Sequence, residues 1–262
     1  MIDTHAHIYS SKFDEDRENV LERAFSSGVE YILLPNIDEG SISSMLEITK
    51  LHGKCIPMMG LHPCSVNKEF DSQLKNIEAE LFGNTNKYIA IGEIGIDLYW
   101  DKTYIKEQID VFRLQIQWAK KLELPIAIHA RDSFQEIFQV LNEEHNDKLS
   151  GVFHCFSGSA EEAKQALSYE GFKLGIGGVV TFKKSTLPSI LESIDLSHLV
   201  LETDSPYLAP RPFRGKRNES MYLTYIVEKL AEVYGIKEQE IINRTSLNAK
   251  ELFNLDKFLR NE

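Results

Sequence analysis

Histidine and carboxylate side chains stand at or near the ends of five short apolar segments of this sequence. In chain order they are His5 and His7, Glu93, His129, His154 and Asp204. Imidazole and carboxylate groups are common ligands of divalent metal ions. If the segments are parallel strands of a barrel, their carboxyl ends meet at one face, and side chains far apart in sequence converge there. The pattern therefore predicts a metal centre that activates water for hydrolysis.

The first two histidines have the spacing of a strand that presents both rings on one side. Side chains alternate between the two faces of a strand, so Asp3, His5 and His7 share a face. Two imidazoles at this spacing can hold one metal ion. An isolated His-x-His pair is equally compatible with hydrogen-bonded core histidines, and the place at a barrel strand's end is what favours metal binding.

Glu93 lies inside an otherwise apolar, glycine-flanked run, residues 89–95. Burying an ionised carboxylate is costly unless a cation or a network of donors compensates it. A metal ion would provide that compensation. A buried Arg or Lys would do the same, but the run itself contains neither.

Two further apolar segments each carry a histidine near their end, His129 in one and His154 in the next. One such histidine is more often a core residue bonded to backbone, whereas two at successive strand ends favour ligation. The last segment, 199–203, is followed by Asp204, and Glu202 shares its strand face. We expect Asp204 to bind metal and to accept the proton of a bound water, and Glu202 to orient a histidine ligand.

Four imidazoles and two carboxylates are more donors than one tetrahedral zinc site requires. Two ions about 3.5 to 4 Å apart are the simpler arrangement, with a shared hydroxide as the nucleophile. Mg, Mn and Zn all suit such ligands. Glu93 is expected to bridge the ions, and the other ligands divide into two sets: His5, His7 and Asp204 for one ion, and His129 and His154 for the other.

The elements that must position these residues alternate between short apolar runs and longer segments of helical periodicity. This alternation is typical of parallel strands joined by crossover helices. Eight strands are predicted, at residues 1–6, 31–35, 55–61, 88–94, 125–129, 152–156, 172–176 and 199–203. A (β/α)8 barrel takes about 250 residues, so the chain is predicted to be one α/β domain, 1–262, a TIM barrel of the metal-dependent hydrolase type.

Helical periodicity is clearest after the fourth predicted strand and recurs twice after the eighth. The apolar residues lie three or four apart and give each helix one apolar face. The three sets are Ile105, Ile109, Phe112, Ile116, Ala119 and Leu122; then Met221, Leu223, Ile226, Val227 and Leu230; and then Ile241, Ile242, Leu247 and Leu252. These helices are expected to pack outside the barrel and complete the ring.

Composition narrows the class of protein. The net charge of -11 argues against broad, non-specific wrapping of nucleic acid, which needs a basic surface, although a local basic patch stays compatible with it. No stretch approaches the roughly 20 apolar residues that span a bilayer, and the first residues have no signal-peptide pattern. The three cysteines show no CxxC spacing and are expected to be reduced thiols. We expect a cytoplasmic protein that has no membrane association, and no obligate protein partner is evident.

These residues, taken together, resemble the TatD family of metal-dependent deoxyribonucleases, which are TIM barrels of the amidohydrolase superfamily. The resemblance covers nearly the whole chain. Its most specific part is LETDSPYLAP at 201–210 with RGKRNE at 214–219, and the others are DTHAH at 3–7, GLHP at 60–63, IGEIGID at 91–97, HARD at 129–132 and FHCFSG at 153–158. It implies hydrolysis of DNA phosphodiesters with two divalent ions, trimming from an end in the 3' to 5' direction, and the six ligands named above.

Two motifs depart from the family's pattern. Members commonly read HCHLD at the first motif, where this chain has Ala6 in place of the cysteine and Tyr9 in place of the aspartate. Neither is a metal ligand in the family, so the resemblance still implies catalysis. The proline that usually follows the Arg-Asn-Glu motif is Ser220 here, which is expected to loosen the start of the next helix.

A basic loop follows the last predicted strand of this acidic chain. Residues 211–217 hold four basic side chains, of which Arg214, Lys216 and Arg217 are expected to bind phosphate. Phe213 in the same loop is expected to stack on a base. The alternative is an ordinary solvated turn.

His62 and Arg131 complete the predicted substrate contacts. His62 is not needed as a ligand, so it is expected to hold the scissile phosphate or to protonate the leaving oxygen, with a structural histidine as the alternative. Arg131 shares a strand face with His129 and is expected to contact a phosphate. Lys183 and Lys184 are expected to extend the basic rim.

The sequence favours hydrolysis of DNA at single-stranded or frayed ends, and two other functions remain open. A metal-activated water also attacks carbonyl carbon, so an esterase or amidohydrolase such as a D-aminoacyl-tRNA deacylase is one alternative. A non-catalytic metal-binding barrel is the other. Retention of the full ligand set argues against a silent barrel, and parallel assays on DNA and charged tRNA separate the two enzymes.

Overall fold

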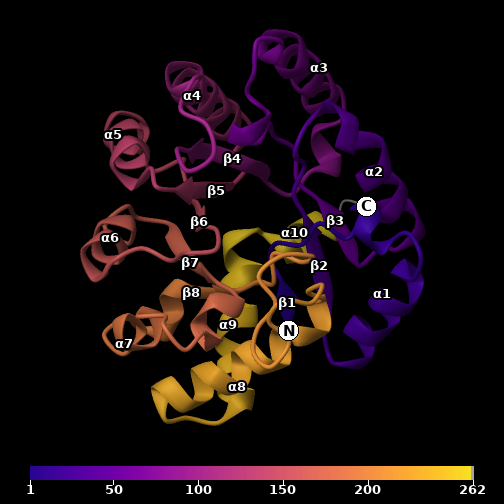
Figure 1. Ribbon diagram of the computed structural model, residues 1–262. Helices are drawn as coiled ribbons and strands as arrows, with labels where there is room; N and C mark the ends of the chain where they lie inside the picture. Colours follow the sequence, from indigo (N-terminus) through magenta and orange to yellow (C-terminus); the bar gives the residue numbers. More distant parts are fainter. Residues whose placement is uncertain (261–262) are drawn as a thin grey trace.

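The structure of the protein is a computed structural model, in which residues 1–260 are described. Strands alternate with helices along the chain (Figure 1). The strands are β1 (Ile2–Asp3), β2 (Tyr31–Leu34), β3 (Cys55–Pro57), β4 (Ile91–Asp97), β5 (Ile126–Arg131), β6 (Gly151–Phe153), β7 (Phe172–Ile176) and β8 (Leu199–Leu201). The helices are α1 (Arg17–Ser26), α2 (Ile42–Leu51), α3 (Phe70–Gly83), α4 (Ile105–Leu122), α5 (Phe134–Glu144), α6 (Ala160–Ala166), α7 (Leu187–Leu191), α8 (Leu223–Tyr234), α9 (Glu238–Leu252) and α10 (Leu255–Phe258).

All strand pairs are parallel, and the strands follow one another in chain order in two sheets, β1-β2-β3 and β4-β5-β6-β7-β8. Isolated parallel bridges link the two sheets at both seams: Met59 with Ile91, and Ala6 with Ser205. At the second seam Thr4 N also donates a hydrogen bond of 3.0 Å to the Leu201 carbonyl. The predicted α/β class and TIM-barrel fold are confirmed.

The carboxyl-terminal helices close one end of the barrel. In Figure 1, α1 to α7 surround the strands, whereas α9 and α10 pass across the middle of the ring. Apolar residues of the strands pack there against α9, α10 and the segment between these helices. The strand residues are Ile2, Leu33, Ile56, Ala127, Val152 and Val200, and their partners are Ala249, Leu252, Phe253 and Leu255. The amino ends of the strands are thereby plugged, and only their carboxyl ends remain for a site.

The fourth strand differs most from its predicted position. It runs Ile91–Asp97 rather than 88–94, so Glu93 is its third residue and not near its end. Its pairing with β5 contains a register shift, and Gly95 has a φ of 142°. A Cβ on Gly95 would overlap the backbone of His129 on β5. The register shift falls between Ile91 and Ile94, and neither it nor the close contact at Gly95 leaves a mark on the apolar periodicity, which is why the pattern misplaced the strand.

The predicted helices are present, with one error in the face of α9. Leu247 was expected on the apolar face, but its side chain is 46% exposed. The buried face contains the polar residues Thr245 and Asn248 instead. Asn248 Nδ2 donates to the carbonyls of Leu196 and Leu199, at 2.8 and 2.7 Å, so a buried amide ties α9 to the start of β8. None of the helices within residues 1–260 is both long and apolar enough to cross a membrane.

Candidate metal centre

The Glu93 carboxylate lies at the centre of the predicted ligands. Its Oε2 is 3.1 Å from His5 Nε2 and 3.6 Å from His7 Nε2. Its Oε1 is 2.7 Å from His129 Nδ1 and 3.6 Å from His154 Nε2. The two oxygens therefore face two different histidine pairs, which is the arrangement that a ligand shared by two ions requires.

Asp204 lies between the same two histidine sets. Its Oδ1 is 3.5 Å from His7 Nε2 and 3.9 Å from His154 Nε2. Its φ of 56° is in the left-handed region, which costs a non-glycine residue on the order of 1 to 3 kcal/mol and is common at functional sites. The side chain keeps 14% of its surface exposed. It therefore joins both halves of the site and also reaches solvent.

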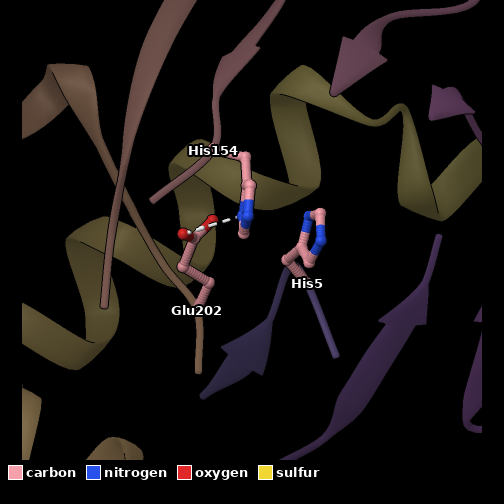
Figure 2. Close-up of side chains that lie close together, drawn as sticks. All are labelled: His5, His154 and Glu202. Atoms are coloured by element: carbon pink, nitrogen blue, oxygen red, sulfur yellow. Dashed lines mark ion pairs between the residues drawn. The ribbon is translucent and has the colours of Figure 1, made fainter. Parts of the chain in front are cut away.

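His5, His154 and Glu202 form the inner wall of the site (Figure 2). The two imidazoles stack with centroids 3.4 Å apart, and His154 Nδ1 lies 3.0 Å from Glu202 Oε1 without hydrogen-bond geometry. His5 Nδ1 and Glu202 Oε2 are buried and find no hydrogen-bond partner in the described part of the chain. Such unpaired atoms cost about 1 to 3 kcal/mol each. The Nε2 atoms of both rings face the Glu93 carboxylate while His154 Nδ1 faces Glu202, so this set of imidazole and carboxylate donors fits a divalent metal.

Glu202 has room at this position because of a glycine in the neighbouring strand, β7. Its Oε1 accepts a hydrogen bond from the Cys155 backbone N–H. A Cβ on Gly175 in β7 would overlap Glu202 Oε2, whereas a Cβ on Gly177 would lie 3.6 Å from the nearest atom, the Glu202 carbonyl oxygen. The carboxylate therefore occupies the space that Gly175 leaves empty and faces His154, one of the predicted histidine ligands.

The Asp97 carboxylate, to which the sequence analysis assigned no role, orients His129. Asp97 Oδ2 is 2.8 Å from His129 Nε2, while the opposite ring nitrogen faces Glu93. Burial alone would lower the pKa of His129, but its hydrogen bonds to Asp97 and Glu93 raise it. An ion would take the place of the proton on Nδ1 and leave Nε2–H to bond Asp97. The signal in the sequence was the position of Asp97, four residues after Glu93 at the end of the same strand.

Tyr9 orients His7, and sequence reasoning also missed this. Tyr9 Oη donates to the Pro35 carbonyl, so it accepts from His7 Nδ1 at 2.9 Å. The His7 proton is thereby held on Nδ1, which leaves the Nε2 lone pair free toward Glu93 and Asp204. Tyr9 stands where the aspartate of the HCHLD pattern would be, and it supplies an acceptor in its place.

His62 also reaches the Glu93 carboxylate, but its hydrogen bonds identify it as a donor. Its Nδ1 accepts from the Cys64 backbone N–H at 3.0 Å, and its Nε2 is 3.2 Å from Glu93 Oε1. Burial lowers its pKa. A neutral imidazole that accepts at Nδ1 carries its proton on Nε2. His62 therefore donates toward the site and is not free to bind an ion through Nε2.

The buried imidazoles and carboxylates of the site shift one another's pKa values. Burial alone would raise the pKa of Glu93, but the surrounding imidazoles hold it well below its usual range. Burial and the adjacent His154 lower the pKa of His5 to about 4. Three groups of possible ligand atoms, each within 4.8 Å of one another, occur in residues 1–260: His5, His154 and Glu202; His5, His7 and Glu93; and His62, Glu93 and His129.

Comparison with known proteins identifies the family. Residues 2–254 match the family model described as TatD related DNase. The chain belongs to the TatD family. It is a metal-dependent hydrolase of that family, and the resemblance seen in its sequence motifs is confirmed.

Relatives of the TatD-family chain extend over its whole length. YabD of Bacillus subtilis, named an uncharacterized metal-dependent hydrolase, is 39% identical over 257 residues, which cover 98% of this chain and 100% of YabD. TatD of Salmonella typhimurium, named a 3'-5' ssDNA/RNA exonuclease, is 34% identical over 97% of this chain and 98% of its own. The crystal structure of the TatD homologue YjjV of Escherichia coli superposes with a TM-score of 0.91, at 29% identity and over 97% and 98% of the two chains.

Three predicted substrate-binding cations of this TatD-family protein are exposed at the rim. The Arg131 guanidinium lies 3.9 Å from the centroid of the Tyr99 ring. The Arg214 guanidinium lies 3.9 Å from the centroid of the Phe182 ring, and Lys216 is exposed nearby in sequence. Both arginines stack on aromatic rings and still offer donors to an anion.

Arg217 and Phe213 are engaged within the protein. Arg217 makes two hydrogen bonds of 2.7 Å to Asp16 and one of 3.1 Å to Glu219. Phe213 stacks on Tyr222, with centroids 4.3 Å apart and planes at 3°. Their expected contacts with phosphate and base stay predictions, and each would require the side chain to leave a partner it already has.

Proposed function

We propose that this TatD-family protein is a deoxyribonuclease that removes nucleotides from the 3' ends of single-stranded or frayed DNA with two divalent ions, Mg, Mn or Zn. The observation that supports it most is the Glu93 carboxylate, whose two oxygens face separate histidine pairs. The name of the Salmonella TatD, a 3'-5' ssDNA/RNA exonuclease, supports this choice of substrate and polarity. We place the activity in one domain, 1–262, acting in the cytoplasm.

In this proposal the ligands form two sets, according to which Glu93 oxygen or which other ligand each histidine faces. One ion would be held by His5, His7 and Asp204, the other by His129 and His154, and Glu93 would be shared. When bound, the ions would polarise the phosphodiester and bring the pKa of a water near neutrality. Three further residues fix the ligand rings: Tyr9 at His7, Asp97 at His129 and Glu202 at His154.

The remaining groups act on protons and on the substrate. Asp204, between both histidine sets and partly exposed, accepts the proton of the attacking water. His62 directs its Nε2–H into the site, where it bonds the scissile phosphate or protonates the leaving oxygen. Arg131, Arg214 and Lys216 contact backbone phosphates at the rim.

The test is degradation of 5'-labelled single-stranded DNA by purified protein with Mg or Mn, beside protein treated with EDTA and the Asp204→Asn variant. We expect a ladder that shortens from the 3' end and is abolished in both controls. Asp147→Asn changes an exposed aspartate outside the site and should cleave like the wild type. An intact substrate after incubation with folded, metal-loaded protein would refute the proposal and make carbonyl esters such as D-aminoacyl-tRNA the next substrates to assay.

A further inference from the structure

Three large aromatic side chains are exposed at the carboxyl end of the barrel, where most large apolar residues are buried. Tyr99 and Trp100 follow β4 and are 54% and 70% exposed, and Tyr207 follows β8 and is 44% exposed. Exposing an indole to this extent gives up the stabilisation that its burial would provide. The metal ligands already described use none of these rings.

The first two rings are fixed to the metal centre by a single carboxylate. Asp97 Oδ1 accepts the backbone N–H groups of Tyr99 and Trp100 at 3.0 and 3.2 Å, while its Oδ2 holds His129. The two rings meet edge to face, with centroids 4.9 Å apart. The exposed Arg131 guanidinium lies 3.9 Å from the Tyr99 centroid and 5.2 Å from the Trp100 centroid. An aromatic pair and a cation are therefore held beside one half of the site.

Tyr207 is fixed to the other half in a comparable way. Its backbone N–H donates to the Asp204 carbonyl at 2.8 Å, and Asn218 Nδ2 donates to the Tyr207 carbonyl at 2.6 Å. Its ring centroid lies 6.1 Å from that of His7. The exposed Lys12 ammonium lies 4.5 Å from the Tyr207 centroid. A third aromatic ring and a second cation thus adjoin the ligand set of the first ion.

The two aromatic–cation groups lie on opposite sides of the mouth. One comes from the loop after β4 and the end of β5, the other from the segments after β8 and β1. In a ring of eight strands in sequential order, these positions face each other across the axis. The Glu93 carboxylate and the histidines around it lie between them.

We propose that these two groups are nucleobase-stacking subsites that hold one single strand of DNA across the metal centre. One base packs on Trp100 and Tyr99, another packs on Tyr207, and Arg131 and Lys12 bind the phosphates beside them. This assignment rests on the proposed nuclease function and adds the means of substrate recognition. Every base has a face for stacking but a paired base is already covered by its neighbours, so such subsites select single strands with little regard to sequence.

The test is binding of a short thymidine oligomer to the full-length Asp204→Asn protein with Mn, measured by anisotropy and by tryptophan fluorescence. The chain has two tryptophans and Trp118 is buried, so quenching on binding reports Trp100. We expect quenching by the thymidine oligomer and much weaker binding of an abasic oligomer of equal length. Trp100→Leu and Tyr207→Leu should each weaken binding about 5- to 100-fold, whereas Trp100→Phe retains most of it.

A matched control is Leu114→Ala, which removes an exposed apolar side chain from α4 and should bind like the parent protein. Equal affinity for the abasic and thymidine oligomers, or unchanged binding by both leucine variants, would overturn the subsites even where DNA is cleaved. Base-dependent quenching in a protein whose wild type cleaves no DNA would support the subsites and overturn the nuclease proposal. The experiment therefore distinguishes a failure of the stacking subsites from a failure of the nuclease proposal.

Discussion

At the scale of single residues, the position of Glu202 depends on the absence of a side chain at Gly175. A Cβ there would overlap Glu202 Oε2, whereas a Cβ at Gly177 would make an ordinary contact of 3.6 Å. We expect Gly175→Ala to displace the carboxylate from His154 and to weaken metal affinity about 10- to 100-fold. Gly177→Ala is the matched control and should bind metal normally. Titration with Mn measures both, and equal affinities would mean that Glu202 does not hold His154.

Tyr9 offers a second single-atom test. Tyr9→Phe removes the acceptor that keeps the His7 proton on Nδ1 and also leaves the Pro35 carbonyl without its donor. We expect metal affinity to fall about 10-fold and stability by about 1 kcal/mol. Calorimetric titration with metal measures the first and urea unfolding the second.

The control for Tyr9 is Tyr104→Phe, which removes a phenol at the start of α4 and should leave metal affinity unchanged. If Tyr9→Phe retains full affinity, the tautomer of His7 is set by something other than this hydrogen bond.

At the scale of elements, a group of charges joins α4 to α5. Glu144, the last residue of α5, accepts from Arg113 Nη1 at 3.0 Å, from Lys120 Nζ at 2.8 Å, and from Gln117 Nε2. Burial alone would raise the pKa of Glu144, but the hydrogen bonds from Lys120 and Arg113 lower it overall. A carboxyl with a lowered pKa in the folded state stabilises the protein above its unfolded pKa, and this contribution is lost as pH falls through the folded pKa.

The lowered pKa of Glu144 predicts how the stability of a variant at this position depends on pH. Glu144→Gln should reduce the free energy of unfolding by about 1 kcal/mol near pH 7. The difference in unfolding free energy between the wild type and the variant should shrink as pH falls below the ordinary pKa of glutamate, about 4.3. Urea unfolding at neutral and acidic pH measures it. Glu143→Gln, at a more exposed side chain that contacts Arg113, should change little, and a gap that stays constant with pH would contradict the assignment.

The elements were largely predictable from sequence, and the exceptions have physical causes. Apolar runs placed all eight strands, because a barrel strand is buried on both faces. The fourth strand was misplaced because its register shift, between Ile91 and Ile94, and its close approach to β5 at Gly95 leave no mark on the apolar pattern. Leu247 was assigned to the wrong face because the buried side of α9 contains Asn248, whose partners are backbone carbonyls distant in sequence.

The convergence of the predicted ligands was equally predictable, but the groups that orient them were not. The structure brings the five other predicted ligands together around Glu93, because the six residues lie in or follow five strands of one ring. Asp97 and Tyr9 act through hydrogen bonds whose direction appears only in three dimensions. The hydrogen bonds that engage Arg217 within the protein were likewise not predictable, because their acceptor Asp16 lies 201 positions away in the chain.

At the scale of the whole molecule, the plug formed by α9 and α10 joins the two sheets. Phe253 is 2% exposed and packs in the apolar cluster with residues of both sheets, including Ile2 and Ala127. We expect Phe253→Ala to lower the free energy of unfolding by about 3 to 5 kcal/mol. Leu247→Ala, on the exposed face of α9, should change it by less than about 0.5 kcal/mol. Urea unfolding compares them, and a small effect of Phe253→Ala would mean that the plug contributes little to stability.

The seam between the first and last strands also fixes the order in which the molecule acquires its chemistry during synthesis. Asp3 accepts from both Thr203 N and Thr203 Oγ1, and Asp204 N donates to the His5 carbonyl. A ribosome makes His5 almost two hundred residues before β8, so that histidine has no final neighbours until β8 has emerged. During that interval of translation the ligands are dispersed, and metal loading has to follow the synthesis of β8.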